Sequence, residues 1–150
     1  MPAFVTIGRV LFVVLFVFSG ASKLFDIAST TQAIAEKVII PGFLTPYTTQ
    51  LEGITGMPTA QLLAILSGVL EVAGGLFIAL NFGARFFAVL LVLFVLVTTF
   101  YFHNFWDMTG ADKINNMIHA LKNLSLVGGL LIIAGYPRPV TVENDRYTGL

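Results

Sequence analysis

The sequence predicts an all-α membrane protein, a bundle of four transmembrane helices in a single domain that covers residues 1–150. The composition is the first evidence, because 57% of the residues are hydrophobic and 11% are charged, whereas soluble domains carry about 25% charged residues. The second is that four apolar runs each reach the roughly 20 residues that a helix needs to cross a bilayer. The third is that all six prolines lie outside these runs, so no proline interrupts a predicted helix.

The four predicted transmembrane helices cover residues 5–24, 60–80, 86–105 and 117–136. The second and third are joined by residues 81–85, in which Gly83 is a typical signal for the end of a helix. A short polar stretch around residues 107–113 joins the third to the fourth. The residues after Pro137 are polar, which predicts a short exposed tail.

The first connection, residues 25–59, is longer than the other two. Its first part places Ile27, Ile34 and Val38 at helical spacings, which predicts a short interfacial helix on the membrane surface or over the bundle. The remainder, residues 41–58, is rich in Gly, Pro and Thr, a composition typical of a loop. Because this segment is also apolar, we expect it to cap the bundle.

The distribution of Lys and Arg predicts the orientation of the chain. In a four-helix topology both termini and the second connection share one side of the membrane, and the first and third connections share the other. The first side carries Arg9, Arg85, Arg138 and Arg146, and the second carries Lys23, Lys37 and Lys113. This bias predicts a multi-pass membrane protein with both termini in the cytoplasm.

Charge and composition also exclude several classes of protein. The 8 Lys and Arg residues balance the 8 Asp and Glu residues, which leaves no net charge to attract nucleic acid. The chain has no Cys, so it cannot form disulfides, thiolate metal sites or cysteine-ligated clusters. The two His residues are isolated from other metal ligands, so no metal site is expected. No phosphate-binding or dinucleotide-binding motif is present, and we expect no cofactor held by such a motif.

Glu71 lies near the middle of the second predicted span, where an ionisable side chain costs about 2.5–3.5 kcal/mol to insert. Ala64, Gly68, Glu71 and Gly75 follow one another at steps of four, three and four, so they share one face of the helix. Small residues on that face allow a second helix to approach closely, and Glu71 is predicted to face the bundle. Two roles stay open, a structural bond between helices and a proton- or ligand-binding site.

Further polar residues lie near the ends of the other spans. Lys23 shares a face with Ser19 at the end of the first span, and either Lys23 or Arg9 could neutralise Glu71 or extend to the lipid headgroups. The end of the first span, the end of the third span and the start of the fourth span meet on the outer side of the bundle. Because each of them carries polar side chains, a polar pocket is predicted there. The candidate residues are Arg9, Lys23, Glu71, His103, His119, Lys122 and Asn123. Two cations and two imidazoles favour an anionic or quinone-like ligand over a metal cation; the alternative is that the lysines reach the headgroups and the histidines cap helix ends.

Three groups of residues give the sequence a family resemblance. They are Gly8-Arg9 with residues 18–24 (FSGASKL), residues 70–75 (LEVAGG), and residues 102–106 (FHNFW) with 121–129 (LKNLSLVGG). In this order they resemble the DoxX family of small four-helix bacterial inner-membrane proteins. The resemblance extends to DoxD, the membrane subunit of a thiosulfate:quinone oxidoreductase, and implies a quinone as a ligand, although a chain without Cys supplies no thiol for sulfur chemistry.

Two functions follow as expectations. The first is a small accessory or scaffold subunit of a membrane-bound, redox-linked complex, which requires a protein partner or a homo-oligomer. The second is a quinone- or small-anion-binding subunit of an oxidoreductase. A transporter is disfavoured by the size of the chain and by the lack of an internal repeat. The residues alone leave open whether the chain is an enzyme.

Overall fold

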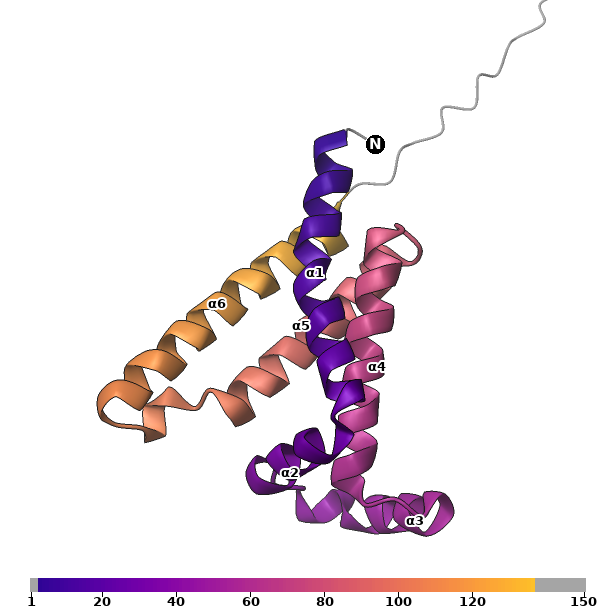
Figure 1. Ribbon diagram of the computed structural model, residues 1–150, viewed down its shortest axis with the longest axis vertical. Coiled ribbons are helices and arrows are strands. Elements are labelled where there is room, and N and C mark those ends of the chain that lie inside the picture. Colours follow the sequence, from indigo (N-terminus) through magenta and orange to yellow (C-terminus); the bar gives the residue numbers. More distant parts are fainter. Residues whose placement is uncertain (1–2, 137–150) are drawn as a thin grey trace, which may run out of the picture.

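The computed structural model describes residues 3–136, so the predicted tail after Pro137, with Arg138 and Arg146, lies outside the described residues. The described part of the chain contains six α-helices and two short 3₁₀ helices (Figure 1). Four of the α-helices are long and apolar enough to cross a membrane. The predicted all-α architecture with four spans is confirmed.

The four long helices lie close to their predicted limits, with one clear difference. They are α1 (Ala3–Phe25), α4 (Thr59–Ala79), α5 (Ala84–Phe102) and α6 (Gly110–Gly135). The start of α6 was predicted at residue 117 and lies at Gly110, because the polar first turns of a helix do not add to the apolar run on which the prediction relied. Asp112 in the first turn suits the positive end of the helix dipole. The earlier start places His119 within α6 and not at its beginning.

The first connection holds two short helices, whereas one was predicted. The predicted helix is α2 (Ile27–Lys37), which begins where the Asp26 carboxylate accepts a hydrogen bond from the Ser29 amide at 3.0 Å. The segment predicted as a loop contains η1 (Gly42–Leu44) and α3 (Thr45–Thr55). Pro46 lies in the first turn of α3 and Gly56 adopts a left-handed φ of 69° after its last turn. These two residues therefore mark the ends of a helix, and their presence misled the prediction of a loop.

Neither short helix can cross the membrane, because 11 residues extend only about 16 Å as an α-helix. Both lie at one end of the molecule, across the end of the α1–α4 pair (Figure 1). The Glu52 carboxylate fastens α3 to the start of α4, since its Oε1 accepts hydrogen bonds of 2.6 Å from both the Thr59 amide and the Thr59 hydroxyl. Both bonds lower the pKa of Glu52, and the bond from the Thr59 side chain has the larger effect.

The turn between α4 and α5 uses its glycine differently from the prediction. Gly83 was expected to end the preceding helix, but α4 ends at Ala79 and Gly83 directly precedes α5 with a φ of 57°. Asn81 adopts a left-handed conformation after α4, with a φ of 59°. Asn tolerates this conformation better than other side chains do, and it takes the place predicted for glycine.

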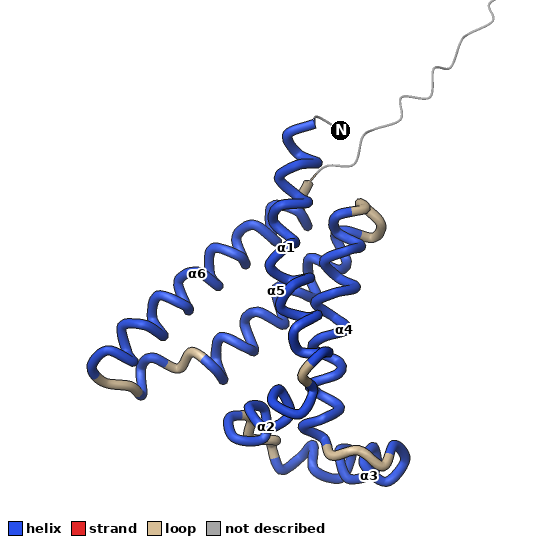
Figure 2. Tube along the Cα trace, in the orientation of Figure 1, coloured by secondary structure: helices blue, strands red, loops and turns tan. Residues whose placement is uncertain are grey.

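The four long helices form a splayed bundle. The α1 and α4 helices lie side by side, whereas α5 and α6 lean away from them toward the end that carries α2 and α3 (Figures 1 and 2). At the opposite end the helices converge on a buried core that contains Val13, Phe16, Ile78, Leu91 and Leu130. The splay leaves space between the two helical pairs in the half where the predicted polar residues lie.

Candidate functional site

An ion pair joins α1 to α4 in the open half of the bundle. The Lys23 ammonium group donates a hydrogen bond to the Glu71 carboxylate and another, of 3.0 Å, to the Ser19 hydroxyl. The Ser19 hydroxyl lies 3.3 Å from both carboxylate oxygens of Glu71 and donates to them. Glu71 therefore faces the bundle and meets a polar partner, as its helical stripe predicts.

The small residues of the same stripe bring the two helices close enough for this pair. Gly68 is buried, and a Cβ placed on Gly20 would lie only 2.6 Å from the Gly68 carbonyl oxygen. The Glu71 side chain is 6% exposed, while the Lys23 side chain is 28% exposed. The carboxylate is thus held inside the protein and its counter-ion reaches it from the open side.

A second polar group joins α5 to α6 on the other side of the space. The rings of His103 and His119 stack with their centroids 5.0 Å apart and an angle of 13° between their planes. His103 Nδ1 lies 3.0 Å from Asn116 Oδ1, within hydrogen-bonding distance. The Asn123 amide donates a hydrogen bond of 2.9 Å to the Thr99 hydroxyl. These contacts connect the end of α5 to the first half of α6.

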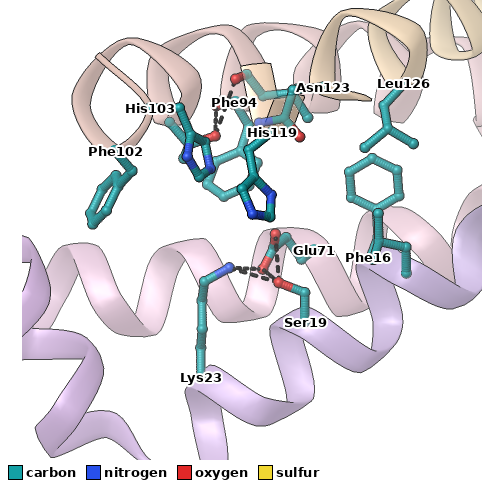
Figure 3. A pocket seen from close by; sticks show the side chains of 13 residues that line it. Phe16, Ser19, Lys23, Glu71, Phe94, Phe102, His103, His119, Asn123 and Leu126 are labelled. Carbon is teal, nitrogen blue, oxygen red and sulfur yellow. Dashed lines mark hydrogen bonds and ion pairs between the residues drawn. The ribbon is translucent and has the colours of Figure 1, made fainter. Parts of the chain in front are cut away.

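The two polar groups face each other across a cavity of about 490 Å³ (Figure 3). We call this space the polar cavity. Its polar lining comes from Ser19, Lys23, Glu71, Thr98, His103, His119 and Asn123, and its apolar lining from Leu15, Phe16, Phe94, Val95, Phe102 and Leu126. Five of the seven predicted candidates, Lys23, Glu71, His103, His119 and Asn123, line this one space.

The other two candidates lie elsewhere. Arg9 is buried at the far end of α1, where it lines a separate space of about 250 Å³ with Phe12, Gly129 and Tyr136. Lys122 is exposed on α6 and is not among the residues that line the polar cavity. The expected pair of cations is therefore reduced to Lys23 alone, whose charge is balanced by Glu71.

The sequence prediction missed the contribution of α5 to the lining. Phe94, Thr98 and Phe102 all line the cavity, and their spacing of four residues places them on one face of α5. The Lys23 ammonium lies 5.6 Å from the centre of the Phe94 ring, within the range of a cation–π contact. The four-residue spacing was the available signal, but in an apolar helix it does not distinguish a cavity wall from a lipid-facing stripe.

The arrangement suits a small ligand with a ring and a few hydrogen-bonding atoms. Aromatic side chains offer flat apolar surfaces, and the ammonium, hydroxyl, amide and imidazole groups are hydrogen-bonding groups on both walls. No set of three or more His, Asp or Glu side chains among residues 3–136 is placed to hold a metal ion.

Comparison with known proteins places this architecture in a family. The DoxX family model matches residues 4–104, which include the first three long helices. The chain is 32% identical over 145 residues to the inner membrane protein YphA of Escherichia coli, covering 97% of this chain and 90% of YphA. It is also 32% identical over 130 residues to the inner membrane protein YqjF of Escherichia coli, covering 87% of this chain and 81% of YqjF. No solved structure gives a significant match. The chain belongs to the DoxX family and is a multi-pass protein of the inner membrane.

Proposed function

We propose that this protein binds a quinone-like molecule in the polar cavity and serves as a membrane subunit of a redox-linked complex. The observation that carries the proposal is the pairing of two polar walls, Lys23–Glu71 and His103–His119, around an otherwise aromatic and aliphatic cavity. A quinone has a flat ring with two carbonyl oxygens on opposite sides. The ammonium group on one wall and the imidazole and amide groups on the other could donate hydrogen bonds to these two oxygens.

The charge of the cavity favours a neutral ligand over the small anion that the sequence also allowed. Lys23 is paired with Glu71, and Lys122 lies outside the lining. An anion entering the cavity would meet the Lys23–Glu71 ion pair, whose two charges cancel, and would find no unbalanced cation among the residues that line the cavity. A neutral ring with carbonyl oxygens carries no charge that would need such a cation.

A scaffold or accessory subunit is the second candidate, and the contact between α1 and α4 favours it. A buried ion pair together with the close approach of Gly20 to Gly68 fixes two helices in one relative position. The same features would serve a protein whose task is to present a rigid surface to a partner. In that case the cavity residues would matter for stability and not for ligand binding.

Ligand binding to the purified protein separates the two proposals. Isothermal titration of the protein in lipid nanodiscs with a fully substituted benzoquinone should give saturable binding. His119→Ala and Asn123→Ala should weaken this binding about tenfold, which corresponds to about 1.4 kcal/mol for lost contacts on one wall. Lys122→Ala is the matched control, because Lys122 precedes Asn123 on α6 but lies outside the cavity lining. Absence of saturable binding, or equal weakening by all three variants, would reject the quinone proposal; a partner that copurifies in fixed ratio would then support the scaffold.

A further inference from the structure

Another space, of about 220 Å³, lies beside the polar cavity, between α2, α4 and α5. We call it the α4–α5 groove. Its lining includes Leu63, Leu66, Ser67 and Leu70 from α4 and Val97 and Tyr101 from α5. Leu66 and Val97 are 63% and 56% exposed, and in a membrane the groove would open onto the hydrocarbon of the bilayer.

The hydroxyl groups of the groove are occupied by the protein backbone. Ser67 donates a hydrogen bond of 2.9 Å to the Ala64 carbonyl, and Thr98 donates one of 3.0 Å to the Phe94 carbonyl. Tyr101 donates one of 3.4 Å to the Ile39 carbonyl. Because these hydroxyls point their hydrogens at backbone oxygens, the groove offers a ligand mainly hydrocarbon surface.

One strip of side chains separates the groove from the polar cavity. Phe94, Thr98 and Phe102 line both spaces. The α4 and α5 helices touch near their shared turn, where a Cβ on Gly74 would lie 3.3 Å from Leu91, and they diverge toward the end where the two spaces meet (Figure 1). The groove and the cavity are therefore adjacent compartments of opposite character, one apolar and one polar.

We infer that the ligand of this protein is an amphiphile whose ring lies in the polar cavity and whose hydrocarbon tail crosses the Phe94–Thr98–Phe102 strip into the α4–α5 groove. The inference rests on the proposed function and adds the class of ligand, a membrane-soluble molecule with a tail that enters sideways from the bilayer. A tail in the groove stays in apolar surroundings, while the ring gains hydrogen-bonding partners that lipid cannot supply.

Photo-crosslinking tests where the tail lies. The probe is a fully substituted benzoquinone whose alkyl tail ends in a diazirine, added to the whole protein in lipid nanodiscs. Mass spectrometry should find the label on the α4 and α5 peptides that contain Leu66 and Val97. An excess of the same benzoquinone without the tail should lower this labelling about tenfold, because both compounds compete for one ring site. An alkyl diazirine without the ring reports labelling of lipid-facing surfaces in general.

Two tryptophan variants on α4 complete the test. Leu66→Trp narrows the groove and should abolish most of the labelling there while leaving the affinity for the tailless benzoquinone unchanged. Leu76→Trp is the matched control, since Leu76 is also an exposed leucine of α4 but lines neither space, and it should change neither quantity.

The possible outcomes distinguish a failure of the proposed tail path from a failure of the proposed function. Labelling that the tailless compound suppresses, but that falls on α1 or α6, would overturn the path of the tail and leave the proposed function standing. Labelling that the tailless compound does not suppress would reject both the path of the tail and the proposed function. Unchanged groove labelling in Leu66→Trp, or loss of tailless binding in that variant alone, would also overturn the inference.

Discussion

Lys23 and Glu71 show how a single pair of residues can hold charge inside an apolar protein. An ionised side chain in such surroundings costs several kcal/mol unless it is paired and hydrogen-bonded. Glu71 receives hydrogen bonds from both Lys23 and Ser19, and these two residues lie one turn apart on α1. The pair is asymmetric, because Glu71 is buried whereas Lys23 is partly exposed.

This asymmetry predicts different costs for removing each partner. Lys23→Met leaves an uncompensated buried carboxylate and should lower the stability by about 3 kcal/mol, the lower end of the range for broken buried pairs. Glu71→Leu should cost less, because the freed lysine can extend toward the headgroups. The double variant Lys23→Met/Glu71→Leu should be more stable than Lys23→Met alone. Thermal unfolding of the four proteins in one detergent measures these differences.

The control for this cycle is Glu36→Leu, which removes an exposed carboxylate whose neighbour in α2 is Gln32. We expect Glu36→Leu to change the stability and any measured assembly less than Glu71→Leu does. If the two single variants, the double variant and Glu36→Leu all lowered the melting temperature equally, the pair would not act as a unit. The assignment of Lys23 as the partner of Glu71 would then fail.

At the scale of the helices, glycine decides how closely α1 and α4 approach. Lipid is as apolar as the side chains, so helices in a membrane associate through close packing and hydrogen bonds. A Cβ on Gly68 would lie 2.7 Å from the Leu24 side chain, and one on Gly75 would lie 2.9 Å from Val17. These contacts place the Lys23–Glu71 pair at bonding distance, so the packing of two helices sets the geometry of the site.

Two alanine substitutions in α1 test this packing. Glycine to alanine in an exposed helix position gains up to about 1 kcal/mol in helix propensity. Gly20→Ala should nevertheless destabilise the protein, because its Cβ would meet the Gly68 carbonyl oxygen, a backbone atom that cannot move aside alone. Gly8→Ala should be neutral or stabilising, since nothing lies within 4 Å of its Cβ position. Equal melting temperatures for both variants would show that α1 and α4 do not pack as described.

The junction between α3 and α4 predicts a pH effect. Hydrogen bonds from Thr59 lower the pKa of Glu52, so the bonds favour the ionised carboxylate. Their contribution to the junction is present above the ordinary pKa of a glutamate and is lost as the pH falls through the lowered value. The NMR signal of the Thr59 amide should titrate with a midpoint below the ordinary value, and Thr59→Ala should raise the midpoint measured on neighbouring amides. A midpoint at the ordinary value in both proteins would contradict the bond.

At the scale of the whole molecule, the splay of the bundle creates the cavity. The α1–α4 pair and the α5–α6 pair converge on the core at one end, where Phe12 of α1 meets Gly129 of α6. They diverge at the end that carries α2 and α3 (Figure 1). Side chains from four helices therefore surround one space, although they lie more than 100 residues apart in the sequence, from Ser19 to Asn123.

The topology predicts the sides of the membrane on which two loops lie. The chain has no cysteine, so a single introduced thiol is unique. In intact cells an impermeant maleimide should label Ala111→Cys, at the start of α6, and should not label Phe82→Cys, in the turn between α4 and α5. Both residues are exposed, and neither occupies one of the positive-φ positions nearby. The opposite pattern would place both termini outside, and labelling of both loops would contradict the four-span topology.

The amino-acid sequence by itself determined the class of protein and the number and placement of the spans. Apolar runs of bilayer length and the positions of proline follow from local physics, because a backbone in lipid must satisfy its hydrogen bonds within the helix. The stripe of Ala64, Gly68, Glu71 and Gly75 also predicted the buried face of α4, since helical periodicity depends only on spacing. The second short helix, α3, was missed because Pro and Gly signal either a loop or the two ends of a helix.

Only the tertiary structure decided which polar residues meet. Lys23, not Arg9 or Lys122, pairs with Glu71, because the close contact of α1 with α4 brings that turn of α1 to the carboxylate. The stacking of His103 on His119 depends on where α6 starts and on the turn before it. The hydropathy of the sequence predicts neither of these two features. The cavity depends on the angle between the two helical pairs, which results from side-chain packing at the opposite end of the bundle. Such packing is a property of contacts between distant segments, and no local pattern encodes it.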